Sequence, residues 1–277
     1  MMSRLKLGGH YLAGLLVTVI FILPLFWALV ASLRQPDLPP PPSIEWWPQT
    51  PHWHNYLEIF HQVPMVRYTL NSLLVVAVAV PVTVVTASLA GFAIEQLPDR
   101  QRRQWVTFSI ALLMIPNASV WLFRFQIFRW LGLLDTLWAL IAPAFAASSP
   151  LFVLLFYWTF RRIPAEIYQA ARLDGANAVK IWWKLALPLT RPTVAGVAVL
   201  TFVMYWSDFV SPVLYIFQPQ RYTLPIGLQI LKQLGPTNWS LLMAAAVFMT
   251  VPVVLLFVFL QSFFLHDMSL ANLLDKD

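Results

Sequence analysis

Long apolar runs alternate with short polar segments along the whole chain. A transmembrane helix needs about 20 predominantly apolar residues to cross the hydrocarbon of a bilayer. Six runs meet this requirement, at about 11–33, 69–94, 105–123, 138–160, 193–216 and 239–265. The pattern therefore predicts an all-α integral membrane protein, with about six transmembrane helices in a single domain over residues 1–277.

The first apolar run, 11–33, could also be a secretory signal. The apolar core of a signal peptide spans about 7–15 residues, and this run is longer, at about 20. We therefore expect it to be an uncleaved span.

Lysine and arginine are distributed unequally between the two sides of this predicted bundle. With a cytoplasmic N-terminus, the inner side holds twelve of the 18: Arg4, Lys6, Arg100, Arg102, Arg103, Arg161, Arg162, Arg172, Lys180, Lys184, Arg191 and Lys276. The outer side holds the other six: Arg34, Arg67, Arg124, Arg129, Arg221 and Lys232. Because cytoplasmic loops carry the excess of basic residues, we predict a multi-pass protein whose two termini both face the cytoplasm.

The predicted outer loop, 34–68, is rich in proline and aromatic residues. Proline lacks a backbone donor and holds φ near −65°, so an extended chain is expected here. Trp46, Trp47, Trp53 and Tyr56 suit the boundary between lipid and water, where a ring meets lipid and its polar atom meets water. We interpret them as interfacial anchors rather than as ligand-binding residues.

Composition and charge narrow the class of protein further. Hydrophobic residues make up 59% of the chain and charged residues only 11%, against about 25% in soluble domains. The net charge of +6 is carried beside apolar runs, which favours lipid headgroups or an acidic partner over nucleic acid. Cysteine is absent and the five histidines are scattered, so the sequence offers no disulfide, thiol nucleophile or metal-ligand spacing.

The segment 161–192, between the fourth and fifth spans, shows helical periodicity that is interrupted at Asp174-Gly175. Before the interruption, one helical face carries residues spaced i, i+3, i+4 and i+7: Ile167, Ala170, Ala171 and Asp174. Small side chains on that face would let another surface approach the backbone closely. Glycine adopts a positive φ without steric cost, so Gly175 is expected to end the helix.

A second helical pattern follows the Asp174-Gly175 break. We expect four of its residues on one amphipathic face in the headgroup layer: Val179, Trp182, Trp183 and Ala186. Lys180 and Lys184 would reach lipid phosphates. The segment is thus predicted to form a helix, a sharp turn and an interfacial helix. This arrangement would fit into a groove of a soluble partner. It would fit equally well as an amphipathic loop that is stabilised by lipid alone.

The same segment resembles the EAA loop of binding-protein-dependent ABC importer permeases. That pattern is Glu-Ala-Ala, three residues, Gly, nine residues, then Ile-x-Leu-Pro; here it reads Gln169-Ala170-Ala171, Gly175 and Leu185-Ala186-Leu187-Pro188. The spacing is kept, but Gln169 replaces the glutamate. An ion pair at that position would become a neutral hydrogen bond, which is weaker, and Glu166 one turn earlier is a candidate to compensate.

The resemblance covers most of the chain and is closest to the carbohydrate, maltose-type branch. The segments that show this resemblance are "LGLLDTLWALIAP" at 131–143, "MIPNASVW" at 114–121, "YWSDFVSPVLY" at 205–215 and "NWSLLMAAAVFMTVPVVLLFVFLQSFF" at 238–264. Asp135 and Ser207 stand where relatives usually have asparagine. The C-terminal "SLANLLDKD" departs from the family's usual tail, so a role for the tail is not carried over.

The resemblance implies a permease subunit of the prokaryotic cytoplasmic (inner) membrane that forms half of a path for a sugar or sugar derivative. The implied partners are a second permease, two ATPase subunits that bind ATP and Mg, an extracytoplasmic substrate-binding protein and membrane lipid, with no nucleic acid. The chain is expected to bind no cofactor and not to be an enzyme: Gly9 and Gly14 have P-loop spacing, but Leu15-Leu16 follow instead of Lys-Ser/Thr. The implied ATPase-docking residues are Glu166, Ile167, Gln169, Ala170, Ala171, Asp174 and Gly175.

An ion-coupled secondary transporter is the alternative, because intramembrane ionisable groups mark ion pathways. Asp208 is the clear carboxylate within the predicted spans, and its role is either packing support or pore lining. The polar residues that we consider for the translocation path are Asn71, Asn117, Gln126, Tyr205, Ser207 and Asp208.

Overall fold

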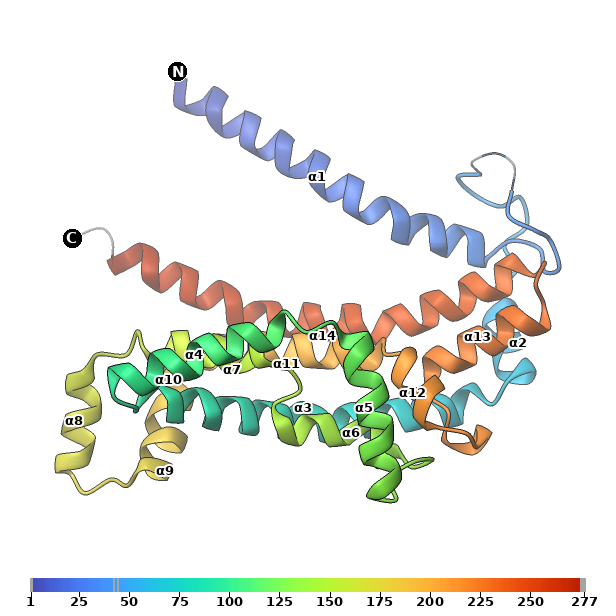
Figure 1. Cartoon of the computed structure of the whole chain (residues 1–277). Coiled ribbons are helices and arrows are strands. Elements are labelled where there is room, and N and C mark those ends of the chain that lie inside the picture. Colours follow the sequence, from blue (N-terminus) through green and yellow to red (C-terminus); the bar gives the residue numbers. More distant parts are fainter. Residues whose placement is uncertain (1, 42, 44, 275–277) are drawn as a thin grey trace. The chain divides into compact units, whose positions relative to one another are not determined.

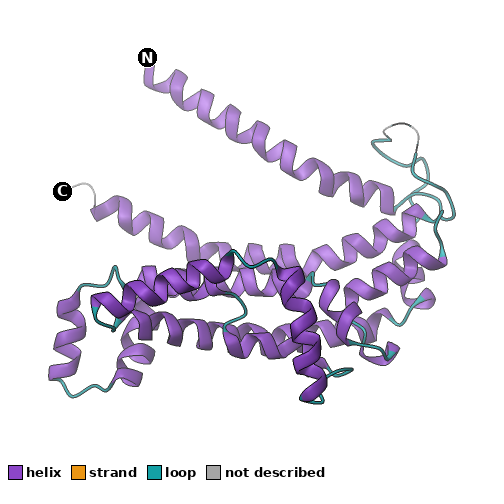
Figure 2. Cartoon of the chain, viewed as in Figure 1, coloured by secondary structure: helices purple, strands orange, loops and turns teal. Residues whose placement is uncertain are grey.

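Helices are the regular elements in a computed structural model that describes residues 2–41, 43 and 45–274 (Figures 1 and 2). Within these residues there is no strand, which confirms the all-α class. The α-helices are α1 Met2–Ser32, α2 Asn55–Gln62, α3 Met65–Glu95, α4 Asp99–Leu113, α5 Asn117–Trp130, α6 Leu137–Ile141, α7 Pro150–Phe160, α8 Ala165–Leu173, α9 Ala178–Ile181, α10 Leu187–Leu189, α11 Arg191–Trp206, α12 Val210–Tyr215, α13 Leu224–Leu234 and α14 Trp239–Leu274. The short 3₁₀ helices η1 Ala142–Ala146 and η3 Pro219–Arg221 and a π-helix, Trp182–Ala186, complete the set.

Among the residues that the structure describes, four helical segments are long and apolar enough to cross a membrane: Gly14–Ser32, Met65–Glu95, Leu137–Phe160 and Trp239–Phe259. Two further pairs of helices meet the same test only if each bent pair is one span, which gives up to six. This range agrees with the six spans expected from the apolar runs, whose boundaries stay a prediction. The basic residues Arg4, Lys6 and Lys276, on which the predicted orientation partly depends, lie outside the described side chains.

The expected third span, 105–123, crosses a sharp bend between α4 and α5. The two helices meet at 96°, and α4 ends at Leu113 before Pro116 precedes α5. Proline supplies no N–H to the helix and disfavours helical φ/ψ at the preceding residue, so Pro116 favours a break here, although α3 and α14 continue through Pro81 and Pro252. Hydropathy alone does not register such a break, because both arms are apolar.

The expected fifth span, 193–216, is interrupted as well. Helix α11 ends at Trp206, and α12 begins at Val210. Asp208 stabilises the second start, because its carboxylate accepts a hydrogen bond from the Ser211 backbone N–H at 3.1 Å. The expected outer loop, 34–68, is not extended throughout, because it contains α2 and the first residues of α3, while its bounds as a loop outside the membrane stay a prediction.

The contacts divide the chain into two compact units, Met1–Val66 with Leu224–Pro252 and Arg67–Thr223 with Val253–Asp277. The single domain 1–277 therefore stays a prediction. In the first unit the side chain of Asn55 donates to the carbonyl oxygens of Ser32 and Arg34, both at 2.8 Å. Trp46, Trp47 and Trp53 are more than half exposed, as an anchoring role requires.

The second unit packs around a core that joins α3, α7 and α11 to the segment after α7. Its fully buried members include Phe156 and Phe160 of α7, and Phe92 of α3 meets Phe160 edge to face at 5.8 Å. The close approach of α3 and α7 requires Gly91. A Cβ built there would lie 2.8 Å from the Phe156 Cβ, the Tyr157 nitrogen and the Val153 oxygen. Small residues let membrane helices pack backbone to backbone in this way.

Asp135 fastens the α5–α6 connection to the segment after α12. Its carboxylate accepts hydrogen bonds from the backbone N–H groups of Phe217 and Gln218, both at 2.9 Å, and pairs with the Arg221 guanidinium at 2.8 Å. Partial burial alone would raise the pKa of Asp135, but the Gln218 and Phe217 donors and the Arg221 charge together hold it below its ordinary value of 3.8.

We expect Asp135→Asn to lower the free energy of unfolding by about 1 kcal/mol, because the amide keeps an acceptor oxygen but loses the charge. A lowered pKa means that the charge stabilises the fold above the unfolded-state pKa and stops doing so as pH falls through the folded-state pKa. The stability gap between wild type and variant should therefore be constant near neutral pH and close below about pH 4. Thermal unfolding in detergent across this range measures it. Asp174→Asn, at an exposed carboxylate, is the control, and a gap that widened on acidification would contradict the assignment.

Candidate functional site

Helix α8 and the turn after it form a helix C-terminus of the Schellman type. The Gly175 N–H donates to the Arg172 carbonyl and the Ala176 N–H to the Ala171 carbonyl, both at 3.0 Å. These are the two bonds of that motif, and they require a left-handed residue at the glycine position, where Gly175 has φ +77°. The Asn177 side chain then accepts from the Lys180 N–H at 2.9 Å and starts α9. The helix–turn–helix that periodicity predicted is present.

Two aromatic side chains fix this helix pair to the core of the second unit. Tyr168 is buried, donates its hydroxyl to the Phe160 carbonyl at 3.2 Å and meets the Phe92 ring at 6.1 Å. Trp182 is buried and donates its indole N–H to the Ser88 hydroxyl at 3.2 Å. Burial, with a smaller contribution from the nearby Glu95 charge, raises the pKa of Tyr168, so its hydroxyl remains a donor. Helix α8 is therefore held directly against α3 and α7.

The opposite face of α8 is free of such contacts in the described chain. Of the predicted docking residues, Glu166, Ile167, Gln169, Ala170, Asp174 and Gly175 are exposed. The expectation that Ala171 shares their face is wrong, because Ala171 packs against the core cluster. Sequence reasoning also missed Leu173, which is 89% exposed at the end of α8. A single exposed leucine is common on protein surfaces, so Leu173 adds to the exposed face of α8 without marking a contact surface by itself.

The second helical pattern does not form the single face that we expected. Val179 and Trp183 are exposed, whereas Trp182 and Ala186 are buried. Residues 182–186 also adopt a π-helix, which departs from the 3.6-residue spacing on which the expected face depends. Periodicity assumes a regular helix and cannot report this change.

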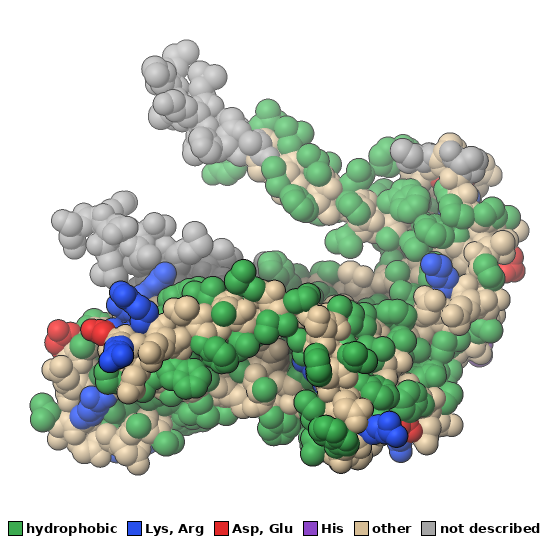
Figure 3. All heavy atoms as spheres, in the orientation of Figure 1, with side chains coloured by type: hydrophobic (Ala, Val, Ile, Leu, Met, Phe, Trp, Pro, Cys, Tyr) green, Lys and Arg blue, Asp and Glu red, His purple; other side chains and the backbone are tan. Residues whose placement is uncertain are grey.

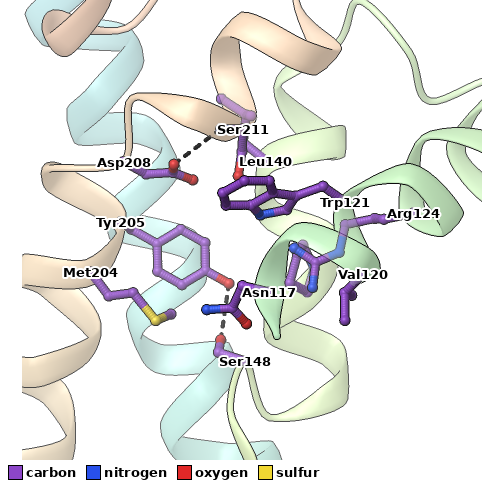
Figure 4. Close-up of a pocket in the computed structure, with 11 residues that line it drawn as sticks. Asn117, Val120, Trp121, Arg124, Leu140, Ser148, Met204, Tyr205, Asp208 and Ser211 are labelled. Atoms are coloured by element: carbon purple, nitrogen blue, oxygen red, sulfur yellow. Dashed lines mark hydrogen bonds between the residues drawn. The ribbon is translucent and has the colours of Figure 1, made fainter. Parts of the chain in front are cut away.

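A cavity of about 200 Å³ lies among α5, η1, α11 and α12 (Figure 4). It is lined by Asn117, Val120, Trp121, Arg124, Leu140, Pro143, Ser148, Met204, Tyr205, Asp208 and Ser211. The Tyr205 hydroxyl bonds with Ser148 at 2.9 Å. Arg124 forms no ion pair with a described carboxylate, although Asp208 lines the same cavity. Aromatic faces, hydroxyls and two opposite charges in one space can hold a polar solute.

Three of the six residues considered for the path line this cavity: Asn117, Tyr205 and Asp208. Asn71 instead donates to the carbonyl oxygens of Gln220 and Tyr222, and the Ser207 hydroxyl bonds to the carbonyl one turn back. Gln126 does not line it either. Sequence analysis did not identify five other residues that line the cavity: Trp121, Arg124, Ser148, Met204 and Ser211. Hydropathy does not predict the bends that bring these residues together.

These features describe a helical membrane protein with up to six candidate spans, a polar-lined cavity between helices, and a helix–turn–helix that Tyr168 and Trp182 attach to the core. Residues 84–269 match the model of the binding-protein-dependent transport system inner membrane component, and the chain belongs to this family. It is the permease subunit of an importer that depends on a substrate-binding protein, and it is a multi-pass inner-membrane protein. It is not itself an enzyme, because ATP hydrolysis in such importers is done by a partner subunit.

Similar proteins have been described. The chain is 30% identical to the sulfoquinovosyl glycerol transport system permease protein SmoH of Agrobacterium fabrum, over 91% of this chain and 88% of that one. It is also 30% identical to the arabinooligosaccharides transport system permease protein AraQ of Halalkalibacterium halodurans, over 81% and 80%. A bacterial ABC transporter involved in the import of the acidic polysaccharide alginate shares the fold, with a TM-score of 0.76, 19% identity and coverage of 95% and 97%.

Proposed function

We propose that this chain forms half of the translocation path of a sugar importer, beside a second permease subunit and above two ATPase subunits. Relatives with 30% identity are named for a sulfosugar glycoside and for arabinooligosaccharides, which supports a sugar or sugar derivative as cargo. Both termini face the cytoplasm, as the Lys and Arg distribution favours. The chain binds no cofactor, and ATP with Mg is held by the ATPase partners.

The observation that carries the proposal is the way in which α8 is attached to the rest of the second unit. Its inner face is tied to the core by Tyr168, while Leu173 and Asp174 are exposed on the outer side. This arrangement suits an ATPase groove that grips α8 and moves it as a rigid body. ATP can drive the change only if the ATPase contacts differ between the two states.

The test is reconstitution of the chain with its companion subunits in vesicles. Uptake of a labelled oligosaccharide should require ATP and the binding protein, and cross-links should form between the ATPase and a cysteine placed at Leu173. An ion-coupled secondary transporter predicts the opposite pattern, because uptake would continue without the ATPase and collapse when an ionophore dissipates the ion gradient. That result would reject the proposal.

The cavity around Tyr205 supplies the proposed path with an aromatic face. We expect Tyr205→Ala to lower sugar uptake roughly tenfold, the equivalent of about 1.4 kcal/mol of lost contact, with the subunits still assembled. Tyr205→Phe keeps the ring and removes only the bond to Ser148, so it should retain most uptake. Ser207→Ala, at a neighbouring residue that does not line the cavity, is the control. Equal uptake by wild type and Tyr205→Ala would place the path elsewhere.

A further inference from the structure

A second cavity, of about 1020 Å³, lies between the start of α4 and the end of α7, apart from the path and from the exposed face of α8. It is lined by Asp99, Arg100, Arg102, Arg103, Gln104, Val106, Tyr157, Trp158 and Arg161. Four arginines and one aspartate give it a strong excess of positive charge. Figure 3 shows Lys and Arg side chains gathered at the end of this unit where α4 begins.

Half of these arginines have internal partners and half do not. Arg102 pairs with Asp99, and Arg161 donates to the Tyr157 hydroxyl at 2.7 Å. Arg100 and Arg103 form no ion pair with a described carboxylate. Two guanidinium groups in one cavity therefore remain available to an anion, and the planar guanidinium fork matches phosphate oxygens well.

Apolar side chains also line the cavity. Trp158 of α7, which is 45% exposed, and Val106 of α4 are among the lining residues. Tryptophan favours the boundary between headgroups and acyl chains. A ligand that fills this cavity therefore has an anionic head for the arginines and a hydrocarbon part for the Trp158 ring.

We propose that this cavity binds the phosphate headgroup of an anionic phospholipid, whose acyl chains run past Trp158 of α7. A soluble phosphate shares the head chemistry but cannot use the exposed ring of Trp158. Basic pockets at the ends of membrane helices bind such headgroups in general, each basic residue contributing about 1 kcal/mol. The size of the cavity also accommodates a headgroup with two phosphates.

The site adjoins the place where residues 161–192, which we call the coupling segment, are attached to the core. The Arg172 guanidinium of α8 donates to the Gln96 side chain, and Gln96 lies in the short connection that leads into Asp99 and the cavity. A headgroup bound to Arg100 and Arg103 holds the start of α4 in place and thereby supports the position of α8. Bound lipid is therefore expected to strengthen coupling as well as to occupy the cavity.

The test uses the full chain assembled with its companion subunits in nanodiscs. These contain phosphatidylcholine alone or with cardiolipin, and native mass spectrometry counts the lipid that is retained. Wild type should retain cardiolipin in preference to phosphatidylcholine. Arg100→Gln with Arg103→Gln should weaken that retention roughly thirtyfold, which corresponds to two lost charge contacts. Arg100→Lys with Arg103→Lys should keep most of it, because the charge remains.

Arg129→Gln with Lys232→Gln is the matched control, since it removes two exposed positive charges outside the cavity. Equal loss in this control and in the glutamine pair would overturn the proposal, because the effect would then be general charge. Displacement of cardiolipin by millimolar inorganic phosphate would assign the site to a soluble anion instead. If the variant with both Arg100→Gln and Arg103→Gln fails to assemble with the companion subunits, the cavity is a contact with a partner subunit and the proposal is overturned. Lipid retention is measured without transport, so it stands or falls separately from the proposed function.

Discussion

Replacing Gly175 with valine is expected to lower ATP-driven uptake about tenfold or more while the protein still inserts into the membrane. The residue holds φ +77° at the Schellman turn, and a β-branched side chain is strained there although space around its Cβ is open. The strain costs about 1–2 kcal/mol, and relief by a changed φ would break the bonds that end α8. The docking face would then be misplaced relative to Tyr168, so we expect uptake to fall about tenfold or more.

Gly132→Val provides a matched control for this variant. Gly132 also has a positive φ, +67°, and open space around its Cβ, but it lies in the connection after α5. Gly132→Val should impose similar backbone strain, but ATP-driven uptake should stay at the wild-type level. The measurement is uptake together with binding-protein-stimulated ATP hydrolysis in proteoliposomes. If Gly175→Val transports as wild type does, the turn does not position the docking surface.

Gly91→Leu should prevent the second unit from packing at all. A single added carbon already overlaps backbone atoms of Tyr157 and Val153 at 2.8 Å, and backbone cannot move aside as a flexible side chain can. Overpacking of a core costs about 1–3 kcal/mol even for smaller insertions, so the larger side chain should exceed the margin that a folded protein has.

The consequence should appear as loss of monodisperse protein on detergent extraction. Gly14→Leu is the control, because a Cβ at Gly14 meets nothing within 4 Å on a membrane-spanning helix of similar apolarity. Gly91→Ala should be intermediate. Normal yield and thermal stability for Gly91→Leu would show that α3 and α7 do not approach as closely as described.

Hydropathy predicted the helical class and the approximate place of the apolar segments, because each depends only on local composition. It did not predict that the run 105–123 bends at 96°, since apolarity is the same on both arms. Pro116 was the available signal, but it was not sufficient, because Pro81 and Pro252 also lie within apolar runs and their helices are continuous. The interruption after Trp206 had a weaker signal, because a serine and an aspartate within an apolar run are also compatible with a continuous helix.

The coupling segment was more predictable than the cavity because its geometry is encoded locally. The Asp174-Gly175 pair specified a turn, and the structure forms it. Whether Ala171 or Leu173 faces outward depends instead on where Tyr168 finds a buried partner, which lies in α3 and α7. The cavity unites residues from separate helices, so Trp121 and Arg124 become recognisable as lining residues only after the chain has folded.

The separation of the two faces of α8 has an evolutionary consequence. Tyr168 ties the helix to its own subunit, whereas Gln169, Ala170 and Leu173 make no contribution to that attachment. Substitutions on the outward side can therefore accumulate as the partner ATPase changes, at little cost to folding. Exchanging these outward residues between two transporters should exchange the ATPase that each one binds, while each transporter keeps its own solute.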